Sequence, residues 1–150
     1  MIEFRPEPAG SEVARRLLSA MEQEMLDLYE MQRMPMPACP EDLEPAAGGA
    51  FVVGWEDGRP VAGGGLTRMG PGVAEIKRMY VVPDARRRGH ARRLLAALED
   101  AARGLGHERV RLDTGARQPH ARALYESAGF RPIPDYNDNP KAAYWGEKVL

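Results

Sequence analysis

A short segment in the middle of the chain combines cations with small residues where a predicted strand gives way to a predicted helix. The strand ends at Val81-Val82 and the helix begins at Gly89. The first turn of a helix leaves backbone N–H groups without internal partners, and these donors suit a phosphate anion, as does the positive end of the helix dipole. Gly89 and Ala91 let the backbone approach such an anion, because neither carries a bulky side chain. The segment therefore predicts a pyrophosphate-binding loop. The cations around it are Arg86, Arg87, Arg88, Arg92 and Arg93.

The same segment allows other interpretations. Short clusters of Lys and Arg often form a solvated basic surface, a nucleic-acid-binding patch or a targeting signal. The ordered spacing of Gly89 and Ala91 at a strand-to-helix junction favours phosphate over these. A Rossmann dinucleotide site is less well supported, because Gly-x-Gly-x-x-Gly is absent and the sequence gives only one clear crossover unit.

Arg86-x-x-Gly89-x-Ala91, after Val82-Pro83, resembles the cofactor motif Gln/Arg-x-x-Gly-x-Gly/Ala of the GNAT superfamily of N-acetyltransferases. The segments 75–81 and 123–130 resemble the same superfamily at the spacing it uses, so the resemblance covers Val73 to Phe130. It implies acetyl-CoA as the acetyl donor, with its pyrophosphate on the backbone amides around 87–92. It also implies that the strands beside the pantetheine arm splay apart to form the cleft for the thioester.

The resemblance implies cofactor contacts along the strand end as well as in the loop. Where the family usually has glycine, this chain has Arg87, and where the family often has asparagine, it has Gln118, whose amide offers the same chemistry on a longer arm. The residues expected to contact the cofactor are Met79, Tyr80, Val81, Arg86, Arg87, Arg88, Gly89, His90, Ala91, Arg92 and Gln118.

Acetyl transfer to an amine needs a neutral amine, a polarised carbonyl and a proton for the departing thiolate. The resemblance implies that Tyr125 donates its phenolic proton to the CoA sulfur and that a backbone N–H of the splayed strand polarises the carbonyl. Glu75 matches the position of the general-base glutamate in histone-acetylating members. Each residue also has a structural interpretation: Tyr125 as a core aromatic, and Glu75 as the ion-pair partner of Lys77 or of an arginine on a neighbouring strand. Asp113 could orient a substrate amine, although we favour a capping role in its loop.

The elements that must position these residues follow from apolar periodicity. A helix capped by Ser11 carries an apolar stripe at spacings of three and four and ends before Pro35. Further helices are predicted at 89–103 and from Pro119 to Gly129. A Pro-rich loop with one short helical turn is expected over 34–49. Strands are predicted at 2–5, 51–55, 61–67, 73–82, 109–113, 130–133 and 143–150.

The order of these elements predicts an α/β fold, or α+β by some conventions. The strand, helix and strand from 73 to 113 imply a right-handed crossover, and hence one parallel pair. The expected sheet is therefore mixed and mostly antiparallel, with about seven strands, flanked by helices. The resemblance implies that its central parallel pair is splayed.

Composition limits the other possibilities. The 150 residues are 43% hydrophobic and 29% charged, which predicts a single domain over 1–150. Apolar runs fall far short of the ~20 residues that cross a bilayer, and the N-terminus lacks a signal-peptide pattern, so we expect no membrane partner and a cytoplasmic location. A net charge of −1 argues against nucleic acid as a partner.

The metal-ligating residue types are sparse. Cys39 has no partner cysteine, and His90, His107 and His120 lack metal-ligand spacing with it or with one another. We therefore expect no metal, a bystander thiol, and histidines at the surface.

The first hypothesis is thus an enzyme that moves the acetyl group of acetyl-CoA directly onto an amine of a small molecule or peptide. A non-catalytic acyl-CoA-binding sensor is the alternative, and a nucleic-acid-binding protein is a third. The acceptor pocket should be shaped by the first helix, the loop 34–49 and the segment 134–140. The methionines of 21–34 could line it, although core packing is the favoured interpretation. A homodimer is possible, because the last strands form dimers elsewhere in the superfamily.

Overall fold

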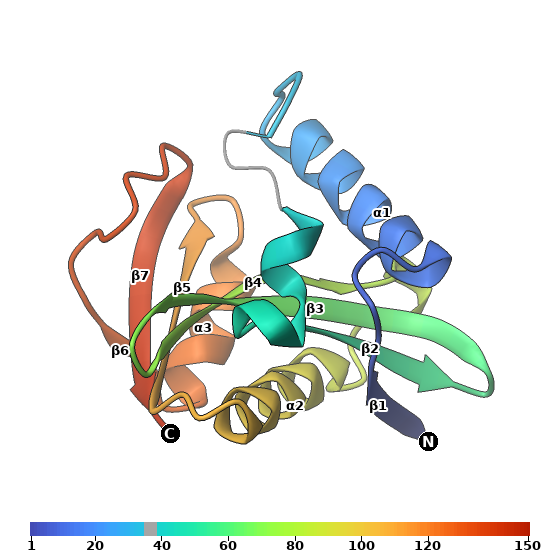
Figure 1. The fold of residues 1–150 in the computed structure, drawn as a ribbon. Helices are drawn as coiled ribbons and strands as arrows, with labels where there is room; N and C mark the ends of the chain where they lie inside the picture. The colour runs from blue at the N-terminus through green and yellow to red at the C-terminus, as the bar shows by residue number, and fades with distance from the viewer. Residues whose placement is uncertain (35–38) are drawn as a thin grey trace.

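The computed structural model describes residues 1–34 and 39–150, and Figure 1 shows a mixed sheet with helices on both faces. The described strands form one seven-stranded sheet in the order β1-β2-β3-β4-β5-β7-β6. The strands are β1 (Ile2–Pro6), β2 (Ala50–Glu56), β3 (Arg59–Gly70), β4 (Val73–Val81), β5 (Arg109–Gly115), β6 (Arg131–Pro132) and β7 (Ala142–Val149). The helices are α1 (Glu12–Leu28), α2 (His90–Gly104) and α3 (Pro119–Ser127), with 3-10 turns η1 (Pro40–Leu43), η2 (Pro45–Ala47) and η3 (Pro83–Ala85).

The central pair of strands forms a fork. β4 and β5 run parallel and pair only from Val73–Arg109 to Glu75–Arg111. Beyond this point β4 continues to Val81 and β5 to Gly115, and no further pairing joins them in the part of the chain that the structure describes. The other neighbouring strands are antiparallel. The predicted parallel pair, and its splaying, are confirmed.

Alternating residues of β2 send their side chains to two separate cores. Phe51 and Val53 pack with Leu17 and Met21 of α1 on one face. Val52 packs on the other face, in the core that also holds the leucines of α2. This is the two-residue period of a strand that is covered on both sides, and in Figure 1 α1 and α2 lie on opposite sides of the sheet.

A bulge distorts β4 inside the fork. Gly63 pairs with Tyr80 and Gly65 with Lys77, so Arg78 and Met79 both lie opposite Gly64. Arg78 takes a positive φ of 60°, which is uncommon for a residue with a side chain. A Cβ on Gly64 would lie 2.9 Å from Leu98 Cδ1, so the absence of a side chain there lets α2 approach the sheet.

The predicted elements are present, with ends that differ by a few residues. α1 begins after Ser11, whose hydroxyl accepts a hydrogen bond from the Ala14 N–H at 3.1 Å. β6 is shorter than the predicted 130–133, and the loop after α1 holds two 3-10 turns, η1 and η2, where one turn was expected. Residues 35–38 of that loop lie outside the described residues. No described helix has the length and apolar character needed to span a membrane.

Candidate active site

Two cavities occupy the fork and meet inside it. The first, here called the loop cavity, has a volume of about 430 Å³ and lies between the end of β4, the loop before α2, and α3. The second, here called the fork cavity, measures about 160 Å³ and lies among α1, the splayed parts of β4 and β5, and the segment before β7. Among the residues that the structure describes, five line both cavities: Met21, Met25, Met79, Gln118 and Tyr125.

The loop before α2 turns its backbone sharply at two places. Arg87 has a φ of 64° and Gly89, the N-cap of α2, a φ of 80°. Successive turns of this kind gather backbone N–H groups into a concave anion-binding site, and the positive end of a 15-residue helix adds to its potential. Most of the residues predicted to contact the cofactor line the loop cavity. They are Met79, Tyr80, Val81, Arg86, Arg87, Gly89, His90, Ala91, Arg92 and Gln118.

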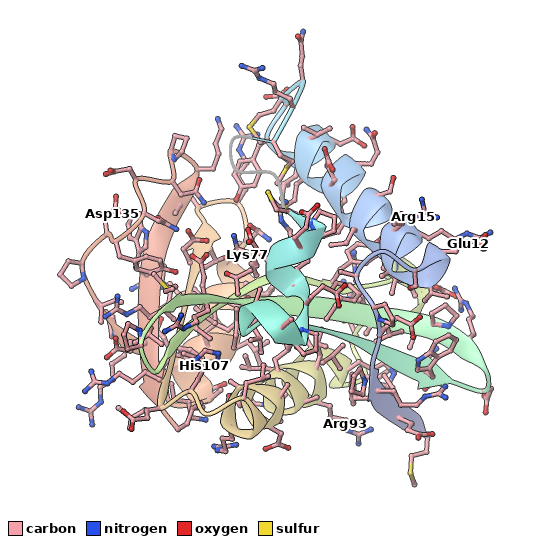
Figure 2. The ribbon with its side chains drawn as sticks, viewed as in Figure 1. Glu12, Arg15, Lys77, Arg93, His107 and Asp135 are labelled. Atoms are coloured by element: carbon pink, nitrogen blue, oxygen red, sulfur yellow. The ribbon has the colours of Figure 1, made fainter. Side chains whose placement is uncertain are left out.

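The arginine side chains of this loop are largely engaged elsewhere. Arg86 donates to Val81 O at 2.8 Å and pairs with Glu24 of α1. Arg88, the one predicted contact that does not line the loop cavity, pairs with Glu56 at 2.9 Å. Arg92 donates to Ser127 Oγ, and the exposed Arg93 points away from the sheet in Figure 2. The backbone amides and the short side chains therefore shape this cavity more than the cluster of charge does.

The histidines depart from the predicted surface position. His90 is only 4% exposed, and its Nε2 lies 3.3 Å from Glu56 Oε2, because the first turn of α2 directs this side chain inward. His107 is 7% exposed and hydrogen-bonded to Gly48 O. The prediction of surface histidines is thus wrong for these two, while His120 is exposed as expected.

The free edge of β4 faces the loop cavity. The N–H of Val82 donates to Val61 O of β3 at 2.9 Å. Backbone groups of successive strand residues point to opposite edges, so those of Val81 face the fork. The same alternation directs the backbone of Met79 to the fork and that of Tyr80 to β3, where Tyr80 pairs with Gly63. Met79 and Val81 therefore offer backbone N–H groups to a ligand in the fork, whereas the Val81 carbonyl already accepts a hydrogen bond from Arg86.

Tyr125 stands where the two cavities join. Its ring packs against Phe130, with centroids 6.0 Å apart, and its hydroxyl lies 3.8 Å from Met79 Sδ. Burial, with a smaller contribution from the Asp113 carboxylate, raises the pKa of Tyr125 to about 12. The hydroxyl therefore remains protonated at neutral pH and is available as a donor.

Glu75 lines the fork cavity at the last position where β4 pairs with β5. Its Oε2 accepts hydrogen bonds from the Tyr136 hydroxyl at 2.7 Å and from Asn137 Nδ2 at 3.3 Å. Its Oε1 lies 3.3 Å from Lys77 Nζ, the ion pair that the structural interpretation expected. Burial and the Glu75 carboxylate raise the pKa of Tyr136 far above its usual range, so this phenol acts as a donor.

Asp113 lies across the fork on β5. Its Oδ2 accepts from Asn137 Nδ2 at 2.6 Å and from Asn139 Nδ2 at 3.2 Å. Asp113 therefore binds the segment before β7, whereas the sequence suggested a cap within its own loop. The burial of Arg78 in the same cavity lowers the pKa of its guanidinium, an effect that nearby Glu22, Asp113 and Glu75 oppose.

Methionines and one tyrosine of the N-terminal region close the fork cavity. Met25, Met31 and Met34 line it, and so does Met21, which also belongs to the core. The methionines thus do more than the core packing that the sequence favoured. The Tyr29 hydroxyl donates to Gln118 Oε1 at 3.2 Å, so the amide expected at the cofactor also ties α1 to α3.

Sequence reasoning found Tyr125 and Glu75 and expected the segment 134–140 to shape the acceptor pocket, which Asn137 and Asn139 do line, but it did not single out the residues that surround Glu75. Tyr136, Asn137 and Asn139 lie in a segment rich in Asp, Asn and Pro, which reads as a turn. The residue pairs that they form with Glu75 and Asp113 are distant in the chain, and only the pairing of β5 with β7 brings them together. No group of three or more His, Cys, Asp or Glu suited to a metal occurs among residues 1–34 and 39–150.

Residues 15–130 match the family model described as the acetyltransferase (GNAT) family. A relative from Bacillus subtilis, named as the uncharacterized N-acetyltransferase YsnE, is 32% identical over 104 residues, which cover 66% of this chain and 69% of the relative. Two further relatives are matched over 53% and 54% of their length, about half of each protein.

Solved structures share the fold over the whole chain. A proposed acyl-CoA N-acyltransferase from Klebsiella pneumoniae is 28% identical, with a TM-score of 0.77, and the match covers 100% of this chain and 98% of that one. A GNAT family acetyltransferase from Elizabethkingia anophelis, solved with acetyl-CoA bound, has a TM-score of 0.71 at 17% identity, over 99% of this chain and 98% of that one.

Proposed function

The chain belongs to the GNAT family of acetyltransferases, and we propose that it transfers the acetyl group of acetyl-CoA directly to a primary amine of a small molecule or peptide. One observation carries the proposal. The loop cavity, which suits a pyrophosphate and an extended arm, meets the fork cavity, which holds Glu75, among residues that include Tyr125.

The loop cavity fits CoA in chemistry and in shape. Backbone N–H groups around Arg87 and Gly89 would hold the pyrophosphate, and the free β4 edge at Met79 and Val81 would hydrogen-bond the pantetheine arm. Bound there, acetyl-CoA supplies an activated thioester. A backbone N–H of the bulged part of β4 is the group available to polarise the thioester carbonyl.

Glu75 is the proposed proton acceptor for the acceptor amine. Its carboxylate lines the cavity on the side of Tyr125 away from the pyrophosphate loop, where an acceptor would enter. It would take the ammonium proton directly or through one water molecule, leaving a neutral amine to attack.

Tyr125 is the proposed donor to the leaving thiolate. Because the pKa of Tyr125 is about 12, its hydroxyl carries a proton throughout the neutral range and can donate to sulfur as negative charge develops there. Cys39 is exposed and lines neither cavity, so the arrangement supports direct attack by the amine without an acetyl-cysteine intermediate.

The small volume of the fork cavity favours a compact acceptor or the end of a chain. It lies below the ~300 Å³ that is usual for sites of drug-sized ligands. Its lining combines methionines with carboxylates and with Lys77, Arg78 and Lys141. An acceptor with an apolar portion next to its amine matches the methionines, whose flexible side chains adapt to different shapes.

The release of CoA thiol from acetyl-CoA, measured over a panel of primary amines that includes n-butylamine, tests this proposal. Mass spectrometry of the products should show an acetylated amine. A protein that binds acetyl-CoA but releases no thiol with any amine would instead be the sensor of the alternative hypothesis. Steeply salt-dependent binding to oligonucleotides would favour the nucleic-acid hypothesis.

A further inference from the structure

One side-chain amide joins the two strands of the fork where their main chains part. Asn137 Nδ2 donates both to Glu75 on β4 and to Asp113 on β5. The last main-chain pair between these strands is Glu75–Arg111, just before Asp113 in the chain. Asn137 therefore extends the link between β4 and β5 by one step beyond the end of their main-chain pairing.

The orientation of this amide is fixed by its other contacts. Asn137 Oδ1 accepts from the Trp145 indole N–H at 3.0 Å and from the Asn139 backbone N–H at 3.2 Å. Both of these groups can only donate, and an ionised carboxylate can only accept. The oxygen of the amide must therefore face Trp145, and its NH₂ group must face Glu75 and Asp113.

The backbone that carries Asn137 is held in turn. Asp135 Oδ1 accepts from the backbone N–H groups of Asn137 at 3.0 Å and Asp138 at 2.8 Å. Trp145 lies opposite Asp113 in the pairing of β5 with β7. The amide is thus anchored to the β5–β7 side of the fork, and it reaches across the opening to Glu75.

We propose that Asn137 is a positioning residue, which holds the Glu75 carboxylate beside Asp113 and acts on acetyl transfer through Glu75. The inference rests on the proposed role of Glu75 as proton acceptor. Two neighbouring carboxylates repel each other, and a donor shared between them offsets part of this repulsion. Without the amide, Glu75 would keep its contacts with Tyr136 and Lys77. It would lose the hydrogen-bonded link that holds its carboxylate next to Asp113 on β5.

Asn137→Ala tests the proposal, with n-butylamine as the acceptor probe. We expect kcat/KM for the amine to fall by about 10-fold to 100-fold, as for the loss of a hydrogen bond to a charged group. The acidic limb of the pH–rate profile should move to higher pH, because the ionised carboxylate has lost a donor. KM for acetyl-CoA should stay unchanged. Asn137→Gln keeps the amide and should restore part of the activity. Asp138→Asn is the matched control in the same loop, and its kinetics should equal those of the wild type.

A double-mutant cycle separates a role through Glu75 from a general structural role. In a Glu75→Gln background, Asn137→Ala should cause little further loss. If Asn137→Ala does not fold, Trp145→Phe removes one of the two donors that orient the amide and should shift the acidic limb in the same direction. Equal losses in both backgrounds, or an unshifted limb in a folded variant, would overturn the role of Asn137 alone. A wild-type protein that acetylates neither n-butylamine nor any other amine would overturn the proposed function, and this role with it.

Discussion

Tyr125 is the only tyrosine that lines both cavities in the described part of the chain, and its hydroxyl lies 3.8 Å from the Met79 sulfur. Tyr125→Phe removes the proposed donor while keeping the ring against Phe130. We expect kcat to fall by about 100-fold or more, as for the loss of a general acid. KM for acetyl-CoA should change little. Steady-state kinetics with n-butylamine checks this, and an unchanged kcat would remove Tyr125 from the mechanism.

The raised pKa of Tyr125 also predicts how the stability of the protein changes at high pH. The pKa of a tyrosine is about 10 in an unfolded chain and about 12 for folded Tyr125. The native state therefore favours the neutral phenol. The stabilisation that comes from burying the neutral phenol is fully present below pH ~10 and is lost as the pH rises through ~12. The change in the free energy of unfolding is about 2–3 kcal/mol. Urea unfolding across this interval should show a smaller loss for Tyr125→Phe than for the wild type. Equal losses would contradict the burial of the hydroxyl.

How far single residues could be predicted depended on whether their signal was local. Tyr125 and Gly89 stand in short motifs, and the structure places both at the cavities. Asn137 has no such motif, because its partners come from β4, β5 and β7, which meet only in the folded sheet. His90 was misjudged because a position in the first turn of a helix does not reveal which side of the helix the protein covers.

At the scale of elements, the junction between β4 and α2 can be tested through its backbone. Gly89 has a φ of 80°, and a Cβ built there meets no other atom within 4 Å. Gly89→Ala should therefore destabilise the protein only by the cost of a left-handed alanine, about 1 kcal/mol. The same variant should also bind CoA more weakly, because the methyl group would stand where the backbone approaches the pyrophosphate.

Gly58 provides a matched control for this change. It has a φ of 75° in the turn between β2 and β3, and its Cβ would also meet nothing within 4 Å. Gly58→Ala should match Gly89→Ala in chemical denaturation and should leave CoA binding, measured by calorimetry, unchanged. Equal CoA affinities in the two variants would show that the Gly89 backbone is not part of the binding site.

The elements themselves were largely predictable, since their apolar periods and their glycine and proline boundaries are local features. α1 and α2 show their buried stripes in the sequence, and the single parallel pair followed from the handedness of the crossover. The bulge at Arg78 was not predictable. It depends on the registers that Gly63 and Gly65 adopt with β4, and these are set by packing across the sheet.

At the scale of the whole molecule, α1 connects the two arms of the fork. On the β4 side, Glu24 pairs with Arg86 of the pyrophosphate loop. On the β5 side, Arg117 donates to Leu28 O at 2.7 Å, and Tyr29 donates to Gln118. Because these contacts join α1 to both arms, the width of the fork is set partly by a helix that belongs to neither strand. Periodicity in the sequence indicates which face of α1 is buried but not the two arms that its ends contact.

The unpaired edge of β4 also has a consequence for the exchange of backbone hydrogens with solvent. In the free protein the amide hydrogens of Met79 and Val81 point into an open fork, while that of Val82 is hydrogen-bonded to Val61. The first two should exchange quickly with deuterium, and Val82 slowly. Addition of CoA should slow exchange at Met79 and Val81 and leave Val82 as it was, which NMR can resolve amide by amide. Such a pattern would mean that the cofactor takes the place of a missing strand, so that the sheet is completed only when the enzyme is loaded.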